Sequence, residues 1–116
     1  MIGEWEWKIN ANGYEGNLKL TSIDLQGKLH GTVYGNPIFG FWDEVSKKIT
    51  FMRLCEPNDP STFQIYTGYL FTNPIKPDAG GTLTYTLTGF FEAFSGTGGV
   101  AQRVLYGWFA RVTIIG

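Results

Sequence analysis

Residues 82–88 read Thr-Leu-Thr-Tyr-Thr-Leu-Thr, so that threonine alternates with Leu83, Tyr85 and Leu87. A period of two places the apolar side chains on one face of an extended strand, and the branched threonines suit the other face of a pleated sheet. Similar alternation recurs at residues 4–9, 17–21 and 28–33. Since no window has sustained apolar spacing of the helical kind, the sequence predicts an all-β chain.

Seven segments rich in Gly, Pro, Asn, Asp or Ser divide the chain into eight strand-length pieces. These residue types favour turns because they supply positive φ, fixed φ or local side-chain hydrogen bonds. The breaks lie at residues 10–13, 24–27, 35–37, 43–47, 56–61, 72–81 and 95–99. Short strands at this spacing are typical of a sandwich or a barrel.

Two features favour the barrel. The connections are short, which suits pairing between successive strands, whereas sandwiches usually need long crossovers. Glycines also occur inside the predicted strands, where they allow the sharp bending of a narrow barrel. We therefore expect a single domain, residues 1–116, folded as an eight-stranded antiparallel up-and-down β-barrel in which the first strand pairs with the last.

Composition and charge limit the classes of partner. The net charge is −1 and the pI is about 5.7, so the chain lacks the basic surface that binding of nucleic acid requires. No apolar stretch approaches the ~18 residues of a membrane-spanning helix, and no secretory signal pattern is visible. The single Cys55 rules out an intramolecular disulfide. We expect a cytoplasmic protein with no nucleic-acid or membrane partner.

Catalytic groups do not converge in the sequence. The carboxylates fall mostly in turns or on outward positions, and no serine sits in a recognisable motif with a histidine and an acid. The only histidine, His30, shares its predicted face with Lys28 and Thr32, which we interpret as the solvent face. A haem-binding barrel would need an inward histidine. The expectation is a protein without enzymatic activity, metal or cofactor.

Aromatic residues make up 16% of the chain and could line or fill the interior. An eight-stranded barrel is just wide enough inside for side chains or for one small ligand. The candidate ligand-binding residues are Trp42, Phe51, Arg53, Tyr69, Tyr85 and Trp108.

Arg53 is the most informative of these candidates. It faces inward if Phe51 does, and it could then orient an acidic group of a small apolar or aromatic ligand. Alternatively, Arg53 faces outward or pairs with Glu56 at the barrel mouth. A competing hypothesis is a structural or protein-interaction module with a filled interior.

Apolar residues are also expected on the outer face of the middle strands. They are Phe39, Phe41, Tyr66, Leu70 and Phe90. Apolar side chains on both faces indicate a sheet that is covered twice, and in a chain without helices the cover must be another copy. The pattern predicts a homodimer or homotetramer.

The two ends of the chain resemble those of the calycin superfamily, the lipocalins and their relatives. Gly3 and Trp5 match the Gly-x-Trp motif of that superfamily, in which the Trp packs at the closed end with a basic residue of the last strand across it. The resemblance implies that Gly3, Trp5 and Arg111 close the barrel, with Trp5 within a residue or two of Arg111. Alternation along the last strand instead places Arg111 outside, unless a bulge intervenes.

Within that superfamily the chain resembles the avidin and streptavidin group. Residues 27–32, Gly-Lys-Leu-His-Gly-Thr, are similar to its G-x-L-x-G-T strand, and residues 66–69 are similar to a later T-G strand. The resemblance implies the same strand order and self-association.

The biotin pocket of that group has a Tyr directly after the Gly-Thr, polar groups in the first turn and a Trp on the fifth strand. Here Val33 follows the Gly-Thr, Tyr34 is predicted to point to the opposite face, and residues 49–54 contain no Trp. The first turn does offer Asn10 and Asn12. Biotin binding and haem binding are therefore alternatives to an unidentified small ligand.

Overall fold

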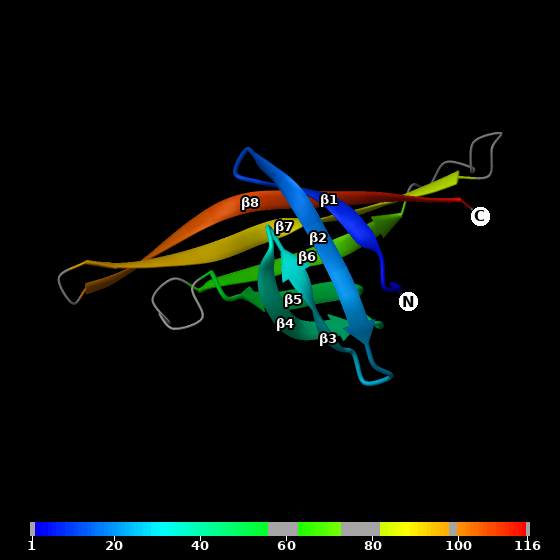
Figure 1. The fold of residues 1–116 in the computed structure, drawn as a ribbon, viewed down its shortest axis with the longest axis horizontal. Helices are drawn as coiled ribbons and strands as arrows, with labels where there is room; N and C mark the ends of the chain where they lie inside the picture. Colours follow the sequence, from blue (N-terminus) through cyan, green and yellow to red (C-terminus); the bar gives the residue numbers. More distant parts are fainter. Residues whose placement is uncertain (1, 56–62, 73–81, 98–99, 116) are drawn as a thin grey trace.

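The chain closes into one barrel in which every strand pairs with its neighbours in sequence. The computed structural model describes residues 2–55, 63–72, 82–97 and 100–115. The strands are β1 (Glu6–Ala11), β2 (Tyr14–Ile23), β3 (Lys28–Val33), β4 (Asn36–Asp43), β5 (Lys48–Arg53), β6 (Gln64–Thr72), β7 (Thr82–Thr97) and β8 (Val100–Ile115). All pairs are antiparallel and the order is β1 to β8 (Figure 1). The predicted eight-stranded up-and-down barrel is confirmed.

Closure is made by β1 and β8. These strands pair from Lys8 opposite Arg111 to Ala11 opposite Trp108. As a result β1 begins and β8 ends at the same end of the barrel (Figure 1).

The described turns follow from local chemistry. Asn12 and Gly13 have φ of 51° and 90°, and Tyr34 and Gly35 have φ of 50° and 78°, as tight hairpin turns require. Asn10 Oδ1 accepts a hydrogen bond from the N–H of Gly13 at 2.9 Å. The predicted break at 56–61 lies outside the described residues, as do residues 73–81 of the break at 72–81 and residues 98–99 of the break at 95–99. Residues 95–97 belong to β7 and pair with β8, so the predicted break at 95–99 is too long.

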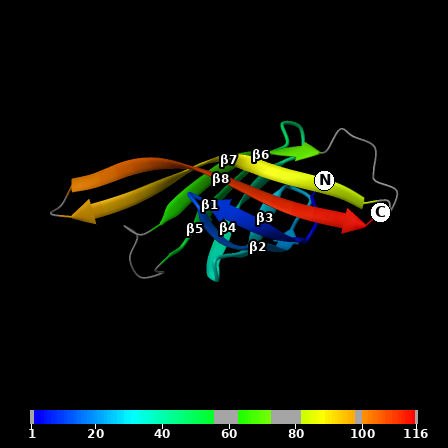
Figure 2. The same ribbon diagram turned by 90° about the horizontal axis from the view of Figure 1, so that it is seen from above.

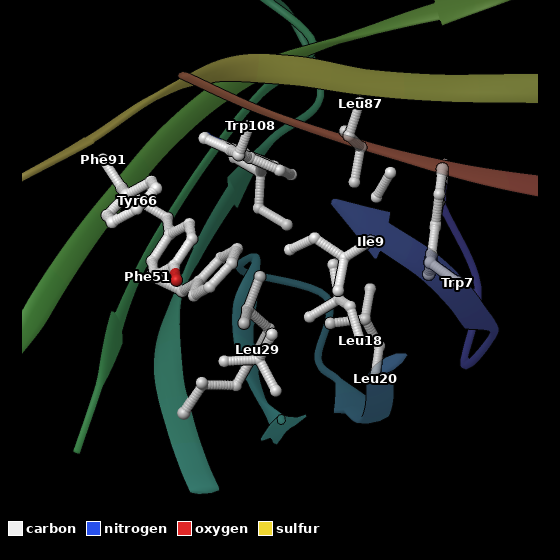
Figure 3. Close-up of a cluster of buried hydrophobic side chains, with 14 of the residues drawn as sticks. Trp7, Ile9, Leu18, Leu20, Leu29, Phe51, Tyr66, Leu87, Phe91 and Trp108 are labelled. Carbon is white, nitrogen blue, oxygen red and sulfur yellow. The ribbon is translucent and has the colours of Figure 1, made fainter. Parts of the chain in front are cut away.

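The core is a continuous apolar cluster contributed by all eight strands. Trp7, Leu18, Leu29, Ile49 and Leu87 are fully buried within it. Figure 3 shows this cluster running from Trp7 at one end to Phe91 and Tyr66 at the other. At the Trp7 end, the ring of Trp5 stacks on Tyr85 with centroids 5.3 Å apart.

β7 and β8 are longer than the barrel. Pairing of β6 with β7 ends at Gln64 and Ala93, and pairing of β1 with β8 ends at Trp108. Beyond these points, within the described residues, β7 and β8 pair only with each other as far as Thr97 and Val100. The two strands form a ribbon that extends past the barrel, at the end opposite the chain termini (Figure 2).

The predicted facing of β6 is wrong. Tyr66 was expected on the outer face, but its side chain is fully buried in the core, whereas Tyr69 is 44% exposed. Leu70, expected outside, is partly buried against the core. The residues at odd positions of β6 are the more apolar set, yet they face outward because the register with β5 and β7 places Tyr66 between the buried Phe51 and Phe91.

The predicted closing pair of Trp5 and Arg111 is also wrong. Arg111 pairs with Lys8, three residues after Trp5, and its guanidinium lies 5.2 Å from the ring centroid of Phe109. Trp108 and Ala110 are the buried positions of β8, so regular alternation leaves Arg111 exposed. Gly3 lies against the indole of Trp5, where a Cβ would approach Trp5 Nε1 to 2.7 Å.

Inward-facing glycines let neighbouring strands approach closely. A Cβ on Gly89 would lie 2.0 Å from the carbonyl oxygen of Thr67, whereas one on Gly107 would meet nothing nearer than 3.9 Å. We expect Gly89→Ala to lower the free energy of unfolding by about 2 kcal/mol, because the Thr67 backbone must move. Gly107 faces outward on β8 and serves as the control. Gly107→Ala should change the free energy of unfolding by less than about 0.5 kcal/mol in urea denaturation. Equal effects would contradict this account of the glycines.

Candidate functional site

A pocket with a volume of about 490 Å³ is lined by residues at one end of the barrel. This is the end from which the β7–β8 ribbon projects, and Figure 2 shows the ribbon. The aromatic lining of the pocket comes from Tyr14, Tyr34, Tyr66, Phe91 and Tyr106, and its polar lining from Asn12, Arg53 and Gln64. One site is therefore formed by the β1–β2 and β3–β4 turns together with nearby residues of β5 to β8.

A stacked row of aromatic rings separates the pocket from the core. Phe51, Tyr66, Phe91 and Tyr106 are direct partners in register across β5, β6, β7 and β8. Successive ring centroids lie 4.7, 4.7 and 5.2 Å apart, and Figure 3 shows Tyr66 between Phe91 and Phe51. Trp108 meets Phe51 and Tyr66 edge-on. These stacked and edge-on geometries are the favourable ones for aromatic pairs.

Arg53, at the end of β5, is held at the pocket wall by neutral side chains. Asn36 Oδ1 accepts hydrogen bonds from Nε at 2.9 Å and from Nη2 at 2.6 Å. Gln64 Oε1 accepts one from Nη1 at 3.2 Å. The guanidinium carbon also lies 4.9 Å from the ring centroid of Tyr34. Glu56, the partner considered from the sequence, lies outside the described residues.

Tyr34 connects Arg53 to the first hairpin. Its hydroxyl accepts a hydrogen bond from the N–H of Ala11 at 3.1 Å and donates one to the carbonyl of Tyr14 at 2.5 Å. Its ring packs on Gly16, where a Cβ would come within 2.3 Å of it. Burial raises the pKa of Tyr34, opposed by the Ala11 hydrogen bond and by the charge of Arg53.

Tyr66 joins the aromatic row to Arg53 through Gln64. The Tyr66 hydroxyl donates to Gln64 Oε1 at 2.8 Å, the same oxygen that accepts from Arg53. Burial raises the pKa of Tyr66 to about 12, although hydrogen bonding and the charge of Arg53 oppose the shift. The phenol is therefore neutral at physiological pH, and Arg53 carries the only charge among the described lining residues.

The structure brings one of the six predicted ligand-binding residues to this pocket. Arg53 lines it. Phe51, Trp42 and Trp108 are buried in the core, and Trp108 Nε1 donates to the carbonyls of Thr67 and Phe90. Tyr85 lies at the opposite end against Trp5, and Tyr69 is on the outer face.

Two lining residues were misplaced by the sequence patterns. Tyr34 was predicted to point away from the interior, but it follows the last residue of β3 and has φ of 50°, so strand alternation no longer governs its direction. Tyr66 was misplaced with the rest of β6. The signal available for Tyr34 is its position before Gly35, since a dipeptide ending in glycine at a strand end indicates a tight turn. No comparable local signal marks Tyr66 or Gln64.

His30 is exposed on β3, as expected. Within the described part of the chain, no three His, Cys, Asp or Glu side chains are grouped so that they could hold a metal ion. The same residues contain no helix long and apolar enough to cross a membrane.

The strand order, the closure and the absence of helix among the described residues define a barrel with the fold of the avidin-like proteins below. Apo shwanavidin is similar to this chain with a TM-score of 0.62 and 12% identity, over 97% of each chain. The rhizavidin–biotin complex is similar with a TM-score of 0.57 and 14% identity, over 97% of this chain and 96% of rhizavidin. At these identities the likeness is one of fold. No protein-family model matches the sequence, and no curated protein does either.

The raised pKa of Tyr66 predicts a loss of stability in alkali. Unfolded tyrosine titrates near pH 10, whereas folded Tyr66 titrates near 12. Its contribution to stability is therefore complete below pH 10 and is lost as the pH rises from about 10 to about 12. We expect the free energy of unfolding to fall more between pH 8 and pH 11 in the wild type than in Tyr66→Phe, measured by urea denaturation.

Tyr69→Phe, in the exposed position of the same strand, controls for loss of a tyrosine as such. Equal losses in the wild type and Tyr66→Phe would show that Tyr66 does not carry this pH dependence.

Proposed function

We propose that this protein is a non-enzymatic barrel that binds one small apolar or aromatic molecule in the end pocket. The observation that carries the proposal is a pocket of about 490 Å³ bounded by the stacked row that ends in Phe91 and Tyr106. Ligand pockets typically span ~300–1,000 Å³ and are mostly apolar with a few polar groups. A planar ligand would add one more ring to the row.

The size of the pocket argues against the competing filled module. One water molecule occupies about 30 Å³ of liquid, so the pocket is far larger than a packing defect. Away from the pocket the interior holds fully buried apolar side chains such as Leu18 and Leu29, as that hypothesis expects. The buried core is consistent with a rigid scaffold, and the end pocket favours a binding role.

The lining residues favour binding over catalysis. The described residues around the pocket include one charged side chain, Arg53, and no carboxylate, histidine or cysteine. General acid–base catalysis needs a titratable pair within reach of one bond. In this lining burial raises the pKa values of Tyr34 and Tyr66, away from the neutral range that favours a general base.

Biotin is a second candidate ligand. Rhizavidin, a similar barrel, has been solved with biotin. Asn12, a polar group of the first turn, lines the pocket, and so does Tyr34, although Val33 stands where the avidin resemblance has its tyrosine. Phe51 lies on the strand where that resemblance requires a tryptophan.

The outer face of the middle strands supports self-association. Phe41, Thr50, Thr67 and Phe90 form one outward row in register across β4 to β7, and Phe39, Met52 and Ile65 begin the next. We call Phe39, Phe41, Met52, Ile65 and Phe90 the outer apolar face. Phe41 is 59% exposed and Phe39 and Phe90 are each more than 40% exposed. Clustered apolar side chains of this kind favour an interface. The proposed partner is a second copy of the chain.

Ligand binding is tested by isothermal titration calorimetry with 2-naphthamide, a neutral bicyclic probe, and separately with biotin. We expect one 2-naphthamide per barrel, and at least tenfold weaker binding by Tyr106→Ala, which removes a ring from the pocket wall. Phe109→Ala removes a ring from the outer face of the same strand and should leave binding unchanged. Absence of binding by both 2-naphthamide and its carboxylate analogue 2-naphthoate would overturn the proposal. Micromolar or tighter binding of biotin would establish the second candidate.

Self-association is tested by light scattering at micromolar concentration. We expect a dimer or tetramer for the wild type and a monomer for Phe41→Glu, because a buried unpaired carboxylate is costly in an apolar interface. Lys19→Glu changes charge on the outer face of β2 and should keep the wild-type mass. A monomeric wild type would contradict the assembly.

A further inference from the structure

The chemistry of Arg53 specifies the ligand more closely. This inference rests on the proposed ligand-binding function and names the class of molecule that the pocket takes. Arg53 lies between Ile38 of β4 and Gln64 of β6 in the sheet register, and the pocket lining includes it. The question is which partner its charge requires.

The acceptors that hold Arg53 are neutral amides. Of its five N–H groups, three are directed to Asn36 and Gln64 in the described structure. One N–H on Nη1 and one on Nη2 have no acceptor on these two amides, and Arg53 also hydrogen-bonds the Tyr66 hydroxyl, a contact that a ligand carboxylate would have to displace or share. Two donors on the terminal nitrogens of one guanidinium match the two oxygens of a carboxylate.

No described carboxylate at the pocket competes for that position. Glu92, the acidic residue next to the lining residue Phe91, instead forms an ion pair with Arg103, 3.1 Å away. Tyr66 is neutral because burial keeps its phenol protonated. The charge of Arg53 is therefore not cancelled by any described lining residue, and a ligand anion would be attracted to it.

The guanidinium is also fixed in direction. Asn36 Oδ1 receives two of its N–H groups while Asn36 Nδ2 donates to the carbonyl of Cys55 at 3.3 Å. The Tyr34 ring lies 4.9 Å from the guanidinium carbon, and Tyr34 itself is anchored to the first hairpin. A side chain held at several points loses little entropy when a ligand binds, which is the advantage of preorganisation.

We infer that the pocket recognises small aromatic monocarboxylates, with the carboxylate on Nη1 and Nη2 of Arg53 and the ring against Tyr66, Phe91 and Tyr106. Asn36 and Gln64 are positioning residues that act through Arg53. The charge-assisted hydrogen bonds make an aromatic acid bind better than its neutral amide of the same shape.

The test compares 2-naphthoate with 2-naphthamide by calorimetry at pH 7. We expect the acid to bind about tenfold tighter or more. Arg53→Gln should bring the ratio of the two affinities close to one. Arg103→Gln, which removes an arginine from the outer surface of β8, should keep the wild-type ratio.

Asn36→Asp tests the positioning role with an isosteric change. An aspartate at this position places a negative charge on the atom that already contacts Arg53, so the acid-to-amide ratio should fall close to one. Retention of the wild-type ratio by this variant would show that Asn36 does not act through Arg53.

The outcomes separate the two proposals. Equal affinity of the wild type for acid and amide would overturn the anion inference and leave the binding function standing. Preference for the acid that survives Arg53→Gln would overturn the assignment to Arg53. Binding of neither probe would overturn the proposed function itself.

Discussion

Pairing of β1 with β8 is the constraint on which the rest of this structure depends. The ladder from Lys8 and Arg111 to Ala11 and Trp108 closes the sheet and removes its edges along the barrel. Closure defines an inside, so that alternation along each strand becomes a division between core and surface. The antiparallel order places the turns after β1 and β3 at one end of the barrel, and closure brings residues of β5 to β8 round to them to complete a pocket.

The two ends of the barrel differ because aromatic residues are distributed unevenly along it. At the end where the chain begins, Trp5 stacks on Tyr85 above the buried Trp7. At the other end the row from Phe51 to Tyr106 follows the adjacent strands β5 to β8, and three of its rings line the open pocket. One set of rings thus completes the core and forms the pocket wall, and this links the stability of the barrel to the shape of its site.

Polar groups at the pocket are connected rather than isolated. Gln64 Oε1 accepts from both Tyr66 and Arg53, and Asn36 holds the opposite side of the guanidinium. Such a network keeps a charged side chain at a partly buried position without an internal carboxylate among the described residues. The same arrangement favours ligands that carry a hydrogen-bond acceptor, because such a ligand can accept from the terminal N–H groups of Arg53.

Period-two alternation, glycine placement and turn residues determined the class of fold, the strand order and the inward positions of Phe91 and Trp108, because these depend on neighbours in the chain. The facing of Phe51 and Arg53 stayed open at that level. The facing of β6 was decided by tertiary structure. Its odd positions are the more apolar set, and only the register of Tyr66 between Phe51 and Phe91 shows that the even positions face inward. The direction of Tyr34 and the partners of Arg53 likewise depend on strands that closure brings together. Local sequence carries the period of a strand, whereas a site is made by side chains that meet across strands.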